Sequence, residues 1–171
     1  MATTYTLISS VTVGSGGAAS IDFTSIPSTY TDLLVSMSLR SAGTGVSTRY
    51  ASVTFNSNTS SYTYRRLYGN GSNAGSDNGS LRIIGTINGS TTTANTFSNL
   101  QLYIPNYAGS NNKSYSCESA EENNATGAEL DMIAGLWSNT AAITSIKLES
   151  DQGSFNFAQY STAYLYGISN A

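Results

Sequence analysis

Apolar and polar residues alternate one by one along several separate stretches of this chain. The stretch 33–40 reads LLVSMSLR, with a large apolar side chain at every odd position, and the stretches 51–55 and 100–104 repeat this period. Successive side chains of a β-strand point to opposite faces, so each stretch predicts a strand with one buried face. No stretch shows the sustained period of 3.6 residues that is typical of a helix.

The remaining candidate strands are separated by turn signals. They cover 5–13, 20–24, 61–68, 80–87, 114–119, 129–137, 143–149 and 160–168. Asn-Gly pairs at 70–71, 78–79 and 88–89 supply the positive φ angles of tight turns, and we interpret 69–80 as a long surface loop. About ten short strands without helical crossovers predict an all-β fold, an antiparallel β-sandwich of jelly-roll type. The length of 171 residues predicts a single domain over 1–171.

Composition argues against several classes of function. The chain has 7 basic and 10 acidic residues, a net charge of -3, one Cys and no His. Without clustered Lys and Arg, we expect no nucleic-acid partner. Without His, the commonest general base and metal ligand is missing. A single Cys allows neither an internal disulfide nor a thiolate zinc site.

The chain also lacks the signals of membrane insertion and export. Met1–Tyr5 contains no basic region and leads into no apolar segment of a signal peptide, and no run of about 18 apolar residues occurs. We therefore expect that the protein is made in a cytosol and that it does not associate with a membrane. In that compartment Cys117 is expected to be a buried thiol.

Carboxylates are the only plausible catalytic groups. Glu118, Glu121 and Glu122 are close in sequence, and the spacing of two in Glu129/Asp131 and Glu149/Asp151 places each of those pairs on one strand face. Such pairs could serve glycoside hydrolysis. We favour solvated charges at strand ends and in loops, and so expect no enzyme and no catalytic residue.

Oxygen ligands for a metal are also few. Asp77 with Asn73 and Asn78 could offer oxygens to Ca²⁺, but Asx-turn chemistry explains these residues more simply. We therefore expect neither a metal site nor a cofactor.

The densest aromatic and cationic cluster lies in 62–68. It comprises Tyr62, Tyr64, Arg65, Arg66 and Tyr68. Tyr and Arg are enriched at protein–protein interfaces, so we predict that this strand contributes to an interface. The alternatives are a sheet edge whose tyrosine rings lie flat on the surface, and aromatic faces that stack on sugar rings.

Two further aromatic features concern the core. Residues 155–166 hold Phe155, Phe157, Tyr160, Tyr164 and Tyr166, whose alternation suggests a last strand with one face in the core. Trp137 is expected to anchor the core rather than to bind a ligand.

Four stretches resemble a family of small virion proteins of tailed bacteriophages that infect aquatic bacteria. They are YTLISSVTVGSGGAASIDFTSIPSTYTDLLV (5–35), NTFSNLQLYIPNYAGSNNKS (95–114), ENNATGAELDMIAGLWSNTAAITSIKL (122–148) and QYSTAYLYGISN (159–170). Such domains occur as free proteins and as parts of longer fibre-like chains. The resemblance brings no catalytic residue.

The resemblance implies a structural protein of the virion, assembled in the host cytoplasm. We expect a capsid decoration (cement) protein, a homotrimer that stabilises the shell through contacts with other virion proteins, the major capsid protein first among them. The absence of heptad or collagen-like sequence favours a compact unit on a shell. The alternative is a tail or fibre-associated receptor-binding protein that recognises host surface glycans.

Overall fold

Two antiparallel β-sheets make up the computed structural model, which describes residues 4–45, 47–124 and 128–169. The large sheet has the order β1 (Tyr5–Thr12), β12 (Thr162–Ile168), β3 (Asp32–Leu39), β8 (Ser98–Ile104), β9 (Lys113–Glu121), β10 (Glu129–Trp137), β5 (Tyr62–Gly69), β6 (Ala74–Gly79). The small sheet has the order β2 (Ser20–Phe23), β11 (Ile146–Ser150), β4 (Thr48–Phe55), β7 (Ile83–Asn88). Some residues used in the sequence analysis lie outside the described residues. They are 1–3, in the segment considered for export, and 125–127 and 170, in the stretches that resemble the virion proteins.

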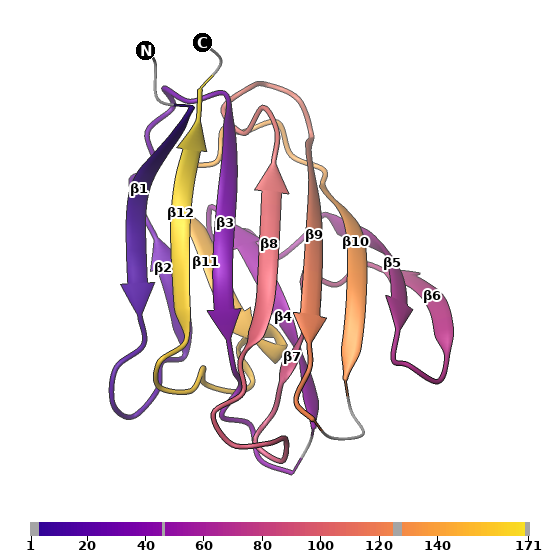
Figure 1. The fold of residues 1–171 in the computed structure, drawn as a ribbon. Coiled ribbons are helices and arrows are strands. Elements are labelled where there is room, and N and C mark those ends of the chain that lie inside the picture. Colours follow the sequence, from indigo (N-terminus) through magenta and orange to yellow (C-terminus); the bar gives the residue numbers. More distant parts are fainter. Residues whose placement is uncertain (1–3, 46, 125–127, 170–171) are drawn as a thin grey trace.

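The two sheets lie face to face, with the large sheet in front in Figure 1. The alternating apolar residues of β3 and β8 point between them, and Leu33, Val35, Leu100 and Leu102 are fully buried. β4 and β11 supply the opposite wall through Val53, Phe55 and Leu148 among others. The predicted alternation thus forms the core between the sheets.

The chain crosses between the two sheets repeatedly. β1, β3, β8 and β12 belong to the large sheet, and β2, β4, β7 and β11 to the small one. Two hairpins interrupt this pattern: β5–β6 follows β4, and β9–β10 follows β8. Both hairpins join the large sheet beyond β8, where β10 pairs with β5. The large sheet is therefore widened on one side by two segments that are far apart in sequence (Figure 1).

The antiparallel β-sandwich predicted from the alternation is confirmed, and the described residues contain only a single 3₁₀ turn, Asp151–Gly153, and no α-helix. The loop predicted over 69–80 is wrong in its second half, because Ala74–Gly79 pairs with β5 as β6.

The prediction of a last strand with one face in the core is confirmed by β12, but the residues on that face are not the tyrosines. Its buried face carries Ala163, Leu165 and Gly167, whereas Tyr160 and Tyr164 are exposed.

The core predictions for Trp137 and Cys117 are confirmed, since both are buried. Trp137 stacks on Tyr62, with 6.1 Å between ring centroids, and lies beside Phe55. Burial raises the pKa of the Cys117 thiol above its usual value, so the thiol is neutral in the fold. In the described part of the chain, no helix has the length and apolar character to cross a membrane.

Candidate functional site

The structure divides the cluster predicted as an interface between the two faces of β5. Tyr62, Tyr64 and Arg66 point between the sheets and are buried, with exposed fractions of 2, 9 and 5%. Tyr68 is half-buried on the same face, and only Arg65 lies exposed on the outer face. The expected surface cluster is therefore corrected, because alternation along one strand sends these side chains to opposite sides. Whether Arg65 contacts a partner stays a prediction.

Arg66 is held inside the sandwich by three carboxylates from two strands, β6 and β10. Its guanidinium lies 2.7 Å from Asp131 Oδ1 and 3.2 Å from Asp77 Oδ2, and it forms an ion pair with Glu129. Its positive charge also faces the Tyr68 ring at 4.5 Å. The two carboxylates paired by sequence spacing, Glu129 and Asp131, are thus brought together, but they share one arginine.

Asp131 also joins the two sheets. Its second oxygen, Oδ2, accepts hydrogen bonds from the Thr86 amide and hydroxyl, both at 2.7 Å, and from the Ser119 hydroxyl at 2.9 Å. Thr86 lies on β7, the edge strand of the small sheet. The Asp131 carboxylate and, at 3.2 Å, the Ser119 hydroxyl oxygen therefore both accept from the amide of this edge strand.

The second predicted carboxylate pair is separated. Glu149 accepts from Arg82 at 3.1 Å, and both residues hydrogen-bond to Thr54. Asp151 lines a cleft of about 210 Å³ that Glu129 and Arg66 also line. The interpretation of all four carboxylates as solvated charges is wrong for Asp131, which is 1% exposed, and for Glu129 and Glu149, which are mostly buried.

Glu121 is a buried carboxyl whose environment the sequence does not reveal. It is 3% exposed, and neither carboxylate oxygen has a hydrogen-bond partner in the described part of the chain. Burial, reinforced by the negative charge of Asp131, raises its pKa to about 8. Glu121 is therefore mostly protonated at neutral pH.

The residues considered as calcium ligands do not gather around one point. Asp77 pairs with Arg66, while Asn73 lies in the turn between β5 and β6 and Asn78 points to the outer face. Among the described residues, no group of three or more His, Cys, Asp or Glu side chains is placed to hold a metal ion.

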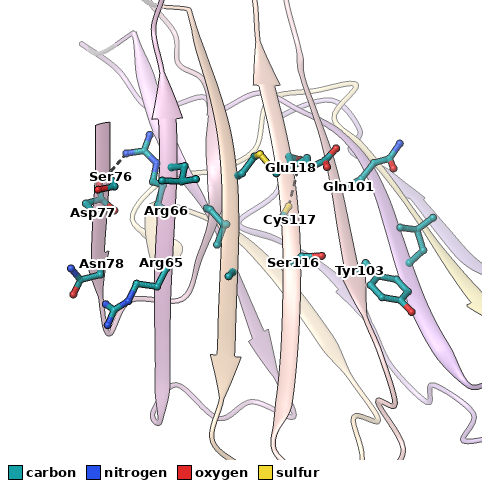
Figure 2. A pocket seen from close by; sticks show the side chains of 15 residues that line it. Arg65, Arg66, Ser76, Asp77, Asn78, Gln101, Tyr103, Ser116, Cys117 and Glu118 are labelled. Atoms are coloured by element: carbon teal, nitrogen blue, oxygen red, sulfur yellow. Dashed lines mark hydrogen bonds and ion pairs between the residues drawn. The ribbon is translucent and has the colours of Figure 1, made fainter. Parts of the chain in front are cut away.

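The outer face of the large sheet carries a groove of about 640 Å³. One row of residues paired across the strands runs Tyr103, Ser116, Ala134, Arg65, Asn78. The next row runs Gln101, Glu118, Met132, Leu67, Ser76. The small residue Ser116 lies between Tyr103 on one side and Arg65 on the other (Figure 2). Its cross-strand partner Ala134 also lines the groove.

Tyr103 is fixed in place, whereas the polar side chains around it are free. Its hydroxyl donates to Asp32 Oδ2 at 2.8 Å, and Asp32 Oδ1 accepts from the Asn106 amide at 2.9 Å. This hydrogen bond to Asp32 raises the pKa of the Tyr103 hydroxyl. The side chains of Arg65, Asn78, Gln101, Ser116 and Glu118 form no hydrogen bond or ion pair with the described residues.

A second surface feature lies on β1 and β12, which we call the tyrosine patch: Tyr5, Leu7, Tyr164, Tyr166 and Ile168. Cross-strand pairing joins Tyr5 to Ile168 and Leu7 to Tyr166. Tyr5, Leu7 and Tyr164 are exposed by 53, 52 and 40%. The patch thus presents large apolar and aromatic side chains to solvent on the same face as the groove. Its strands β1 and β12 lie at the edge of the sheet opposite to β5 and β6 (Figure 1).

Sequence reasoning missed the groove, although a signal for it was present. The alternation in 100–104 already placed Gln101 and Tyr103 on the outer face. What the sequence does not contain is the pairing of β9 with β10 and of β10 with β5, which brings Arg65 and Asn78 opposite Tyr103.

Comparisons of this chain with protein-family models, with curated proteins and with solved structures found no match.

Proposed function

We propose that this chain is a structural protein of a bacteriophage virion, a capsid decoration protein that binds its neighbours through the tyrosine patch. The observation that carries this proposal is the exposure of Tyr5, Leu7 and Tyr164 on the outer face of the two neighbouring strands β1 and β12. Tyr is one of the residues that contribute most to protein–protein binding, and burial of an exposed apolar side chain such as Leu7 adds the hydrophobic free energy of its area. The partner that we propose is the major capsid protein.

The fold is consistent with that role. We propose that a jelly roll is formed by the eight strands outside the two hairpins, which are β1–β4, β7, β8, β11 and β12. In a jelly roll the chain folds back on itself as one long antiparallel pair, and this pair wraps around the core. The orders β1-β12-β3-β8 and β2-β11-β4-β7 support this, because they are the orders that such wrapping produces. The β5–β6 and β9–β10 hairpins are then additions to one sheet of the jelly roll.

Two features of the carboxylates support a non-catalytic role. A general acid needs a carboxyl kept protonated beside a site that substrate can reach. Arg66 neutralises Asp131 and Glu129, and Arg82 neutralises Glu149. Glu121 has a raised pKa, but it is buried between the sheets.

The test is to quantify this chain in purified particles by mass spectrometry. We expect on the order of hundreds of copies per particle, as a decoration protein on a shell requires. A few dozen copies or fewer would indicate a tail component and overturn the capsid assignment. Absence from particles would overturn the virion role altogether.

The patch itself is tested by incorporation of variants into particles. Leu7→Ser should reduce incorporation strongly, because it removes an exposed apolar side chain from the patch. Leu81→Ser is the matched control, since Leu81 is also an exposed leucine, at 42%, but lies outside the patch. Equal incorporation of the two variants would place the docking surface elsewhere.

A further inference from the structure

The groove on the outer face has the two components of a ligand site: a rigid aromatic wall and a set of polar groups without partners. Tyr103 is held by Asp32, which is itself held by the Asn106 amide. The ring therefore keeps its orientation without a ligand, and binding would not have to order it. Its exposed fraction is 37%, so one side of the ring is accessible.

The polar groups around the ring are planar amide, carboxylate and guanidinium groups, each of which can form two hydrogen bonds at once. Gln101 and Asn78 each present an amide with donors and an acceptor, Glu118 presents a carboxylate, and Arg65 presents a fork of donors. None of these side chains has a hydrogen bond or ion pair within the described residues. Elsewhere in the fold the charged side chains of Arg40, Arg66, Arg82 and Lys113 are all engaged. The groove is thus a place where hydrogen-bonding capacity is left for something outside the chain.

The dimensions and charge of the groove limit what that molecule is. Arg65 and Glu118 lie on β5 and β9, two strand spacings or about 10 Å apart. One positive and one negative side chain on opposite sides do not suit a polyanion such as a nucleic acid. The part of the lining formed by Ser116 and Ala134, with Met132 and Leu67 beside it, is weakly polar. A ligand with apolar ring faces and many hydroxyl groups matches this combination.

We propose that the groove binds an oligosaccharide. One pyranose ring lies against the Tyr103 ring, its hydroxyl groups donate to Glu118 and exchange hydrogen bonds with Gln101, and the next sugar residue reaches Arg65 and Asn78 (Figure 2). This inference goes beyond the proposed docking role and does not require it, because the patch belongs to β1 and β12, whereas the polar groups of the groove come from β8, β9, β5 and β6. The two surfaces are neighbours, since Leu34 pairs with both Tyr166 and Tyr103. A virion protein with both surfaces would attach to the particle by one and to a glycan by the other.

The experiment is a titration of the labelled full-length chain with hexasaccharides, followed by amide chemical shifts. The probes are maltohexaose, cellohexaose, chitohexaose and hexagalacturonate, each raised to about 10 mM so that a millimolar Kd is detected. We expect at least one probe to shift the amides of Tyr103, Ser116 and Arg65. Shifts confined to other surfaces, or none with any probe, would overturn the proposal.

Variants separate ring stacking from hydrogen bonding. Tyr103→Ala should weaken binding of the active probe about tenfold or more, because it removes the aromatic wall. Glu118→Gln should weaken it less. Tyr160→Ala is the matched control, since Tyr160 is also exposed but lies in the loop before β12. Unchanged binding by Tyr103→Ala in a variant with native amide dispersion would also overturn the proposal.

A second copy of the chain is the competing occupant. If the groove amides shift on raising the protein concentration without saccharide, the groove is a self-association surface and the saccharide proposal fails. Failure here is distinct from failure of the virion role, because Leu7→Ser and particle incorporation report on the tyrosine patch, whereas Tyr103→Ala reports on the groove.

Discussion

At the scale of single residues, Asp131 has the largest number of polar partners of the carboxylates described above. It accepts from Arg66, Thr86 and Ser119, and those residues belong to β5, β7 and β9. One buried side chain therefore connects the inserted hairpins to the edge of the small sheet. Removing a buried acceptor leaves its donors without a partner, which is costly.

Asp131→Asn should accordingly lower the free energy of unfolding by about 1–3 kcal/mol, because Arg66 would lose one of its three carboxylate partners and the buried donors of Thr86 and Ser119 would lose a charged acceptor. Chemical denaturation measures this change. Glu122→Gln, at an exposed position, is the control and should stay within about 0.5 kcal/mol of the unmodified chain. A cost for Asp131→Asn as small as that of the control would show that the network contributes nothing to stability.

Glu121 predicts a dependence of stability on pH. Its pKa is about 8 in the fold against an ordinary value of 4.5, so between these values the folded chain holds a proton that the unfolded chain has released. The free energy of unfolding must then fall as pH rises through this window and level off above it. Thermal melts from about pH 5 to about pH 9 should show Tm of the unmodified chain falling more steeply than Tm of Glu121→Gln. Parallel curves for the two proteins would contradict the assignment.

The ion pair between Arg66 and Asp131 could not be predicted from the sequence. The pair Glu129/Asp131 was found from its spacing, but its arginine was assigned to a surface. Arg66 and Asp131 are 65 residues apart, and only the pairing of β10 with β5 brings them together. Burial of a charge depends on such distant partners, which local alternation does not reveal.

At the scale of elements, tyrosine rings repeatedly cover glycines on the neighbouring strand. Tyr115 lies over Gly135, Tyr64 over Gly79 and Tyr68 over Gly75, and each of these is a directly paired cross-strand position. Tyr30 covers Gly167 in the same way. A glycine exposes its backbone and packs poorly, and a ring laid over it restores the lost contact. The abundance of both residue types, 12 Tyr and 16 Gly, is thus partly explained by sheet packing.

Gly135→Ala should therefore destabilise the sandwich by roughly 1–3 kcal/mol, because the added methyl group would overlap the Tyr115 ring. Differential scanning calorimetry measures the change. Gly14→Ala is the matched control: its added methyl group meets open space, and the expected effect is within about 0.5 kcal/mol. Similar melting temperatures for both variants would mean that the Tyr115 ring moves aside at little cost.

The elements themselves were largely predictable. Strands such as β3, β8 and β10 combine alternation with clear boundaries, and the structure places them where the sequence indicates. β6 was missed because AGSDNG has the composition of a turn and no apolar residue except Ala74. It is a strand because β5 offers it an edge, and that partner is visible only in the fold.

At the scale of the whole molecule, the two added hairpins make the two sides of the large sheet different. One side consists of β1 and β12, and the other consists of the hairpin strands β9, β10, β5 and β6. The tyrosine patch lies on β1 and β12, and the groove lies over β8, β9, β10 and β5 (Figure 1). The sequence predicted a sandwich and a tyrosine-rich interface, but it placed that interface on the strand 62–68. In the structure the tyrosines of β5 face the core or its margin. The exposed tyrosines of the patch, Tyr5 and Tyr164, lie instead near the other edge of the sheet, on β1 and β12.

We propose that this chain docks on a phage shell by the tyrosine patch and leaves the β5 side of the groove open to solvent. A cryo-electron microscopy map of purified particles, with this domain fitted into the density, tests it most directly. We predict that Tyr5, Leu7 and Tyr164 face the neighbouring capsid protein and that Arg65, on β5 towards the other edge of the sheet, faces solvent. Density that places β1 and β12 in solvent, or particles that lack the domain, would contradict the account.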